Sequence, residues 1–97
     1  IFRKPEYFKK TIKVLIAENV INDKFVCIKT RKTDKGIFTA LVDVLKNKQY
    51  VYNRISDEEY AKLLKEKFTD LDITGRTLRN PGTNSFIEFK QIFNELL

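Results

Sequence analysis

Apolar side chains recur every three or four positions along most of this chain, with polar residues between them. This spacing predicts amphipathic helices that each bury one face. Pro5 suits the first turn of such a helix, and Pro81-Gly82 is expected to stop another. The predicted helices span residues 5–19, 34–46, 57–68, 74–80 and 86–96. The pattern therefore predicts a mainly α fold of about five helices.

Two short stretches break the helical pattern. Residues 24–30 are rich in β-branched and apolar side chains over the length of a strand, which predicts a short strand. Tyr50-Val51-Tyr52 is a second extended stretch that could pair with it. Pairing would give a winged-helix-like architecture with one or two short strands, and its absence a purely helical one. The sequence leaves both open.

Capping residues mark where several helices begin. Ser56 stands three residues before Glu59, so the serine hydroxyl can accept a hydrogen bond from the Glu59 amide. Ser85 opens a second capping box before the last helix, and Thr33 or Asp34 can cap the second helix. These positions predict the first residues of three helices.

Composition narrows the classes of function. The 97 residues suffice for one domain and, since none is Met, we read residues 1–97 as a piece of a longer protein. There is no His, one Cys and only three glycines, which argues against imidazole catalysis, a zinc site, an internal disulfide and a glycine-rich phosphate loop. We therefore expect no enzyme, no cofactor and no metal. The lone Cys27 and the lack of a signal peptide or long apolar run favour a cytoplasmic protein without a membrane segment.

Positive charge is concentrated near the start of the chain, whose net charge is +6. Residues 1–36 hold ten basic and four acidic side chains, a surplus of six, whereas residues 37–97 hold nine of each. A basic end on a small domain predicts an acidic partner, most often nucleic acid, although a solvated lysine-rich helix face has the same composition. The side chains expected to contact DNA phosphates are Lys10, Lys13, Lys29, Arg31, Lys32 and Lys35.

Residues 56–80 have the layout of a helix-turn-helix. A helix with an acidic first turn is followed by a turn at residues 71–73 and by the short helix that starts at Thr74. Arg can bond guanine, Asn can bond adenine, and a threonine hydroxyl can hold a phosphate at a helix N-terminus. The predicted base-contacting residues are Thr74, Arg76, Thr77, Arg79 and Asn80. Any two short amphipathic helices joined by a turn share this pattern, and the acids at residues 57–59 would repel a DNA backbone beside them.

Two further clusters have a plainer explanation than a functional site. Asp70 and Asp72 could ligate magnesium, but paired acids beside threonines are more typical of a capped turn. Tyr50, Tyr52 and Tyr60 could stack on single-stranded bases, but aromatic clusters in small domains usually belong to the core or its margin.

The order of these features resembles a known family. The residues that carry the likeness are Ile28-Lys29-Thr30, Lys32-Thr33-Asp34, Ala40, Leu41, Leu45, Asn53-Arg54-Ile55-Ser56-Asp57, Tyr60, Ala61, Leu64, Phe68, Leu71-Asp72-Ile73, Arg76-Thr77-Leu78-Arg79 and Asn84-Ser85-Phe86. Over residues 24–97 the chain is similar to the C-terminal region of the RteC-type regulators, which control excision of conjugative transposons in Bacteroidetes. The resemblance implies a cytoplasmic transcriptional regulator of a mobile element, with a C-terminal region that resembles a winged helix-turn-helix acting on promoter DNA.

We therefore expect a domain that binds double-stranded DNA, with the helix at residues 74–80 in the major groove. The alternative is a protein-interaction or dimerisation module without a nucleic-acid role. Such a module would expose an apolar patch, for example Phe2, Tyr7, Tyr50 and Tyr52, among scattered lysines. A homodimer or another protein partner is compatible with either reading.

Overall fold

The helices follow the apolar pattern of the sequence in a computed structural model that describes residues 2–30, 34, 36–79 and 84–97. They are α1 (Pro5–Ala17), α2 (Gly36–Asn47), α3 (Asp57–Lys67), α4 (Gly75–Arg79) and α5 (Asn84–Leu96). Five helices and almost no β structure in the described ranges confirm the mainly α fold. The radius of gyration, 12.0 Å, is that of a compact fold of this length. None of the described helices combines the length and the apolar character that a bilayer span requires.

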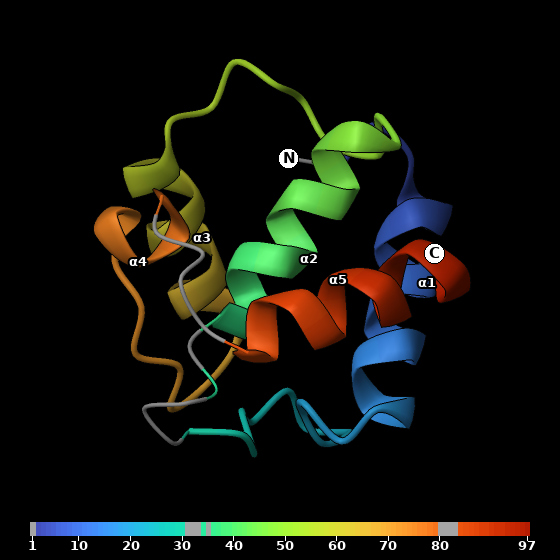
Figure 1. Ribbon diagram of the computed structural model, residues 1–97, viewed down its shortest axis with the longest axis vertical. Coiled ribbons are helices and arrows are strands. Elements are labelled where there is room, and N and C mark those ends of the chain that lie inside the picture. The colour runs from blue at the N-terminus through green and yellow to red at the C-terminus, as the bar shows by residue number, and fades with distance from the viewer. Residues whose placement is uncertain (1, 31–33, 35, 80–83) are drawn as a thin grey trace.

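Helix α2 lies at the centre of the molecule, between α1 on one side and α3 and α4 on the other (Figure 1). It is apolar on nearly every side, and among its residues only Asp43, Lys46 and Asn47 are not buried. Such a helix is stable only where other elements cover it all round. Its most extensive backbone contact is with α5, and α4 packs against both α2 and α3.

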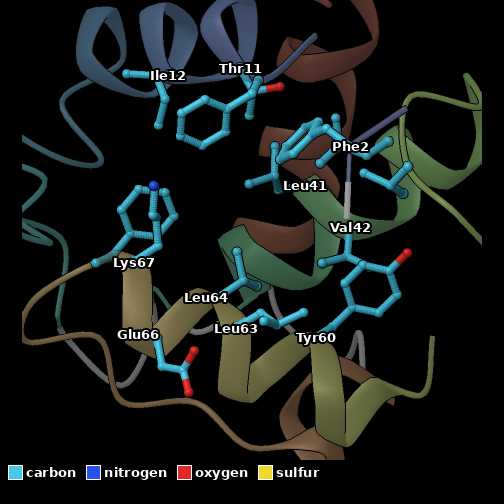
Figure 2. A pocket seen from close by; sticks show the side chains of 14 residues that line it. Phe2, Thr11, Ile12, Leu41, Val42, Tyr60, Leu63, Leu64, Glu66 and Lys67 are labelled. Atoms are coloured by element: carbon cyan, nitrogen blue, oxygen red, sulfur yellow. The ribbon is translucent and has the colours of Figure 1, made fainter. Parts of the chain in front are cut away.

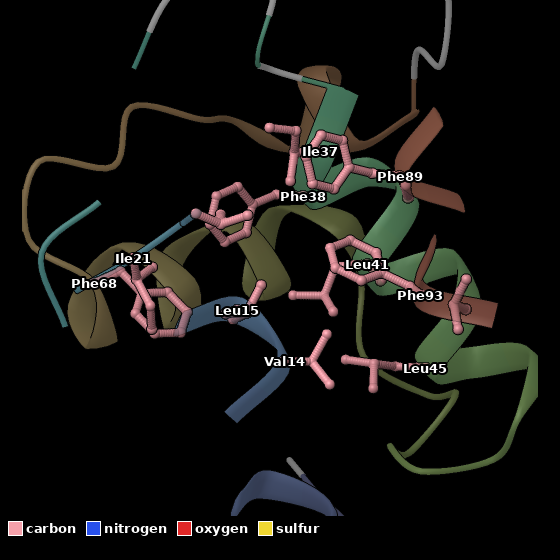
Figure 3. Close-up of a cluster of buried hydrophobic side chains, with 14 of the residues drawn as sticks. Val14, Leu15, Ile21, Ile37, Phe38, Leu41, Leu45, Phe68, Phe89 and Phe93 are labelled. Carbon is pink, nitrogen blue, oxygen red and sulfur yellow. The ribbon is translucent and has the colours of Figure 1, made fainter. Parts of the chain in front are cut away.

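The hydrophobic core is built around the side chains of α2. Leu15 of α1, Phe38 and Leu41 of α2 and Phe93 of α5 are almost completely buried and belong to one cluster (Figure 3). The ring of Phe68, which directly follows α3, lies 5.9 Å from that of Phe38. Residues from both ends of the chain therefore share one core with its middle.

Two predicted caps have different outcomes. Ser56 is the N-cap of α3, and its hydroxyl accepts a hydrogen bond from the Glu59 amide over 3.2 Å, which confirms Ser56 as the cap. The second prediction is wrong, because α5 already begins at Asn84 and Ser85 lies buried in its first turn. For α2, Asp34 is buried and Thr33 lies outside the described residues.

The strand predicted over residues 24–30 is wrong. Among the described residues β structure is limited to isolated bridges, which join Phe2 to Val51, Ile21 to Cys27 and Val26 to Thr69. The Asn22 side-chain oxygen accepts hydrogen bonds from the backbone amides of Lys24 and Val26, and this curls the segment into a turn. Phe25 within it has a left-handed φ of 61°, which no regular strand contains.

The second extended stretch pairs with a different part of the chain than the winged architecture requires. Val51 bridges to Phe2, and the Arg3 amide donates to the Tyr50 carbonyl over 2.9 Å. This stretch therefore meets the start of the chain rather than residues 24–30. Residues 31–33 and 35, which follow the predicted strand, lie outside the described ranges.

Candidate nucleic-acid interface

The two helices of the predicted helix-turn-helix are packed against each other. Helix α4 lies beside α3, on the side of the molecule opposite α1 (Figure 1). They approach closely at Gly75, where an added Cβ atom would lie 2.8 Å from the backbone nitrogen and side chain of Glu58. A contact that short would force the backbone to shift, so glycine at this position lets α4 sit directly on the first turn of α3.

Thr74 and Thr77, both predicted to contact bases, are engaged in capping α4. The Thr77 amide donates to the Thr74 hydroxyl, and the Thr74 amide donates to the Thr77 hydroxyl, each over 3.3 Å. The Thr77 carbonyl accepts a further hydrogen bond from the buried hydroxyl of Thr39 in α2, over 2.9 Å. These bonds satisfy backbone groups at both ends of a helix of five residues, whose own hydrogen bonds are few. Thr74 is exposed and Thr77 is half-buried.

Arg79, also predicted to contact a base, forms an ion pair with Glu58 of α3. The hydrogen bond from the Arg79 guanidinium lowers the pKa of the Glu58 carboxyl and raises the pKa of Arg79. Both side chains remain more than half exposed. Arg79 therefore neutralises one of the three acidic charges at residues 57–59. These are the charges that the sequence predicts would repel a DNA backbone.

Arg76 is exposed on the same helix. In contrast to Arg79, it has no carboxylate within ion-pair distance in the described part of the chain. Its guanidinium is therefore available to an external acceptor. Asn80, the last of the predicted base contacts, lies outside the described residues.

An open groove next to α4 contains two lysines that the sequence analysis did not select. Lys62 and Lys65 of α3 line this groove together with Thr74 and Gly75, the residues at the start of α4. Glu66 also lines it. The two lysines are exposed and lie one helical turn apart, so they face the same side of α3. The sequence did not indicate them, because the acidic first turn of α3 predicts a surface that repels DNA. Their position next to α4 follows only from the packing of α4 onto α3.

The lysines of α1 lie elsewhere. Helix α1 and helix α4 occupy opposite sides of the molecule (Figure 1). Lys13 is exposed, whereas the Lys10 ammonium donates to the Leu97 carbonyl over 3.1 Å. Lys29 is half-buried and lines a small cavity of about 50 Å³. The remaining predicted phosphate contacts, Arg31, Lys32 and Lys35, lie outside the described residues. The structure thus does not bring the α1 lysines and α4 to one face.

The candidate magnesium ligands Asp70 and Asp72 lie close to Cys27. Asp70 has a left-handed φ of 65° and, with Asp72, lines the small cavity next to Cys27. Among the described residues, no three or more His, Cys, Asp or Glu side chains cluster in a way that could hold a metal ion. Burial raises the pKa of the Cys27 thiol, so the thiol stays protonated at neutral pH.

The tyrosines predicted to form an exposed patch are largely engaged within the protein. Tyr7 and Tyr50 stack on each other with ring centroids 4.2 Å apart, and the Tyr50 hydroxyl donates to the Leu97 carbonyl. Both rings are half-buried. Tyr52 is half exposed, under the Arg3 guanidinium. The arrangement offers one exposed ring rather than a continuous apolar surface.

Comparison of the chain with models of protein families, with curated proteins and with solved structures finds no match.

Proposed function

We propose that this chain is a domain that binds double-stranded DNA through α4 and the adjoining face of α3. The observation that carries the proposal is the exposed Arg76, which has no carboxylate partner among the described residues and stands on a helix packed closely against α3. Arg is the side chain that most often reads a guanine edge in the major groove, because its two parallel donors match the guanine acceptors. The resemblance to RteC-type regulators supports a role in transcriptional control of a mobile element.

The local charge around α4 is compatible with a DNA backbone. Glu58 would repel phosphates, but its pairing with Arg79 removes most of that effect. The remaining charges that line the groove are then Lys62, Lys65 and Glu66, a net charge of +1. Arg76, on the adjoining helix, adds a further positive charge. In this proposal Arg76 contacts a base, Lys62 and Lys65 hold phosphates, and Arg79 keeps Glu58 neutralised.

This proposal moves the phosphate contacts from α1 to α3. Helix α1, which carries Lys10 and Lys13, lies on the opposite side of the molecule from α4, and the Lys10 ammonium is already hydrogen bonded. They would contribute through long-range attraction, which salt screens over about 10 Å at moderate ionic strength. Direct phosphate contacts, by contrast, release counterions and leave a measurable salt dependence.

The test is fluorescence anisotropy of a labelled random duplex at several salt concentrations, with wild-type protein and two double variants. Lys62→Ala/Lys65→Ala removes the proposed contacts, and Lys9→Ala/Lys24→Ala removes the same charge from exposed positions outside α3 and α4. We expect the first double variant to reduce the log–log salt slope by about 2 and the second to leave it nearly unchanged. Equal slopes for all three proteins, or a larger decrease of the slope in the control, would show that Lys62 and Lys65 do not contact DNA phosphates.

Arg76 is tested on a site selected from a random duplex library. Arg76→Ala should weaken binding to the selected site by about 1–3 kcal/mol and affect random duplex much less, since a base contact carries specificity and a phosphate contact does not. A uniform loss on both duplexes would make Arg76 a phosphate contact, and no loss on either would contradict the assignment of α4 as the reading helix.

A further inference from the structure

A cavity of about 390 Å³ lies between α1, α2 and α3, away from the surface formed by α3 and α4 (Figure 2). Helix α1 makes no extensive backbone contact with α3, and side chains of α2 form the floor between them. Ile12, Leu41 and Leu64 face this space from the three helices. Small-molecule sites in proteins have volumes of roughly 300–1,000 Å³ and mostly apolar walls, so this cavity falls in that class.

The hydroxyl groups in the cavity wall are already satisfied within the protein. The Thr11 hydroxyl donates to the Tyr7 carbonyl over 2.7 Å, and the Tyr60 hydroxyl donates to the Tyr52 carbonyl. Burial raises the pKa of Tyr60, which keeps this hydroxyl protonated and donating. Neither group therefore has its proton free for a ligand.

Lys67, at the end of α3, is the cationic side chain of the cavity wall. Its ammonium points into the space between α1 and α3, whereas the neighbouring Glu66 carboxylate points away from it (Figure 2). The ammonium lies 4.8 Å from the ring centre of Phe8 and 5.9 Å from that of Phe25. No acceptor in the described part of the chain forms a hydrogen bond or ion pair with it. The cavity thus combines apolar walls with one available positive charge.

We propose that this cavity binds a small anionic amphiphile, namely a carboxylate with an alkyl chain. The alkyl chain would lie among Ile12, Leu41 and Leu64, where each methylene removed from water favours binding. The carboxylate would pair with the Lys67 ammonium at the edge of the cavity. The charge selects an anion because only an anionic headgroup forms an ion pair with the Lys67 ammonium. This inference is independent of DNA binding, because it uses none of the residues proposed to contact DNA.

The test is calorimetric titration of the protein with dodecanoate below its micellar concentration, combined with amide NMR shifts to locate the site. We expect saturable one-to-one binding, with shifts centred on Ile12, Leu41 and Leu64. Lys67→Ala should weaken dodecanoate binding by about tenfold, the loss of one charge-assisted contact, whereas Lys67→Arg should retain it. Lys9→Ala, an exposed lysine of α1 outside the cavity wall, is the matched control and should bind like the wild type.

Dodecanol, which has the same chain without the charge, separates the contribution of the headgroup from that of the chain. It should bind wild type and Lys67→Ala equally. The proposal is overturned by any of these outcomes: absence of saturable dodecanoate binding, equal dodecanoate affinity in wild type and Lys67→Ala, or NMR shifts centred outside the cavity. Shifts of the cavity residues that depend on protein concentration without ligand would likewise overturn it, since a second copy of the chain would then cover this face.

Discussion

The Glu58–Arg79 ion pair joins the first turn of α3 to the last turn of α4. Both partners are exposed, and exposed ion pairs contribute little to the free energy of unfolding because water and salt screen them. The importance of this pair lies in the surface it creates. Asp57 is paired with Lys46 over 3.5 Å, so without Arg79 the start of α3 would present Glu58 and Glu59, with no ion-pair partner in the described part of the chain, next to the helix proposed to read DNA. Arg79 thus changes the charge of the proposed interface more than it changes the free energy of unfolding.

The pairing predicts a measurable titration. The hydrogen bond from Arg79 lowers the pKa of Glu58 in the folded protein, so the interaction is present at neutral pH and is lost as the pH falls through that pKa. In Arg79→Ala the Glu58 pKa should rise toward the ordinary value of a glutamate. The measurement is a carbon-detected NMR titration of the Glu58 carboxyl in both proteins. Lys62→Ala is the control and should leave the Glu58 pKa near its wild-type value. An unchanged pKa in Arg79→Ala would show that the pair does not form in solution.

At the scale of the element, α4 depends on its neighbours. A helix of five residues is too short to be stable alone, because it forms few backbone hydrogen bonds for the residues it orders. Thr74 caps its start, Thr39 of α2 bonds the Thr77 carbonyl, and Gly75 allows contact with α3. The orientation of Arg76 therefore follows from contacts made by other residues of α4.

Gly75→Ala should destabilise the fold, although alanine favours helices over glycine by about 1 kcal/mol. The added Cβ would lie 2.8 Å from the Glu58 backbone nitrogen, and such overpacking typically costs about 1–3 kcal/mol, so we expect a net loss. Urea unfolding followed by circular dichroism measures it. Arg76→Ala, an exposed change in the same helix, should stay within about 0.5 kcal/mol of wild type. A Gly75→Ala variant as stable as wild type, or more stable, would mean that α4 does not pack this closely on α3.

At the scale of the whole molecule, α2 organises the fold and α1 joins it chiefly through side chains. Leu15 of α1 is completely buried in the common core. The Tyr7–Tyr50 stack and the hydrogen bond from Lys10 to the Leu97 carbonyl add contacts between α1 and distant parts of the chain. The backbone of α1 meanwhile stays apart from α3, which leaves the apolar cavity between them.

Leu15→Ala should therefore lower the free energy of unfolding by about 2–5 kcal/mol, the usual cost of a cavity left by a fully buried leucine. Ile87→Ala removes an aliphatic side chain that is 69% exposed on α5 and should change stability by less than about 0.5 kcal/mol. Both values come from urea unfolding monitored by circular dichroism. Similar losses in the two variants would contradict the position of α1 in the common core.

The sequence predicted the helices well and the extended segments poorly. Helical periodicity is a local property, so the apolar stripes and the Ser56 cap identified helices whose ends the structure confirms within a few residues. Residues 24–30 have the composition of a strand. The Asn22 side-chain oxygen, however, accepts hydrogen bonds from the Lys24 and Val26 amides, and the chain forms a turn instead. Cys27 bridges to the nearby Ile21, whereas Val26 bridges to the distant Thr69, a partner that composition did not reveal.

The candidate site was predicted in part. The position of α4 and the exposure of Arg76 follow from the cap, the helical spacing and the turn residues around them. Lys62 and Lys65 were missed because an acidic helix start suggested a surface that repels DNA. The Glu58–Arg79 pair was not predictable from spacing, since its members are 21 positions apart and meet only when α4 folds back on α3.

The sequence by itself determined a small, mainly helical fold with a basic surplus, no histidine and a single cysteine. Those properties depend on composition and on periodicity within one element, which the chain carries before it folds. The tertiary structure alone decided that Arg79 neutralises Glu58, that Lys62 and Lys65 flank α4, and that the Lys67 ammonium faces an apolar cavity. Each of these depends on the distance between residues of different elements, and packing around α2 sets those distances.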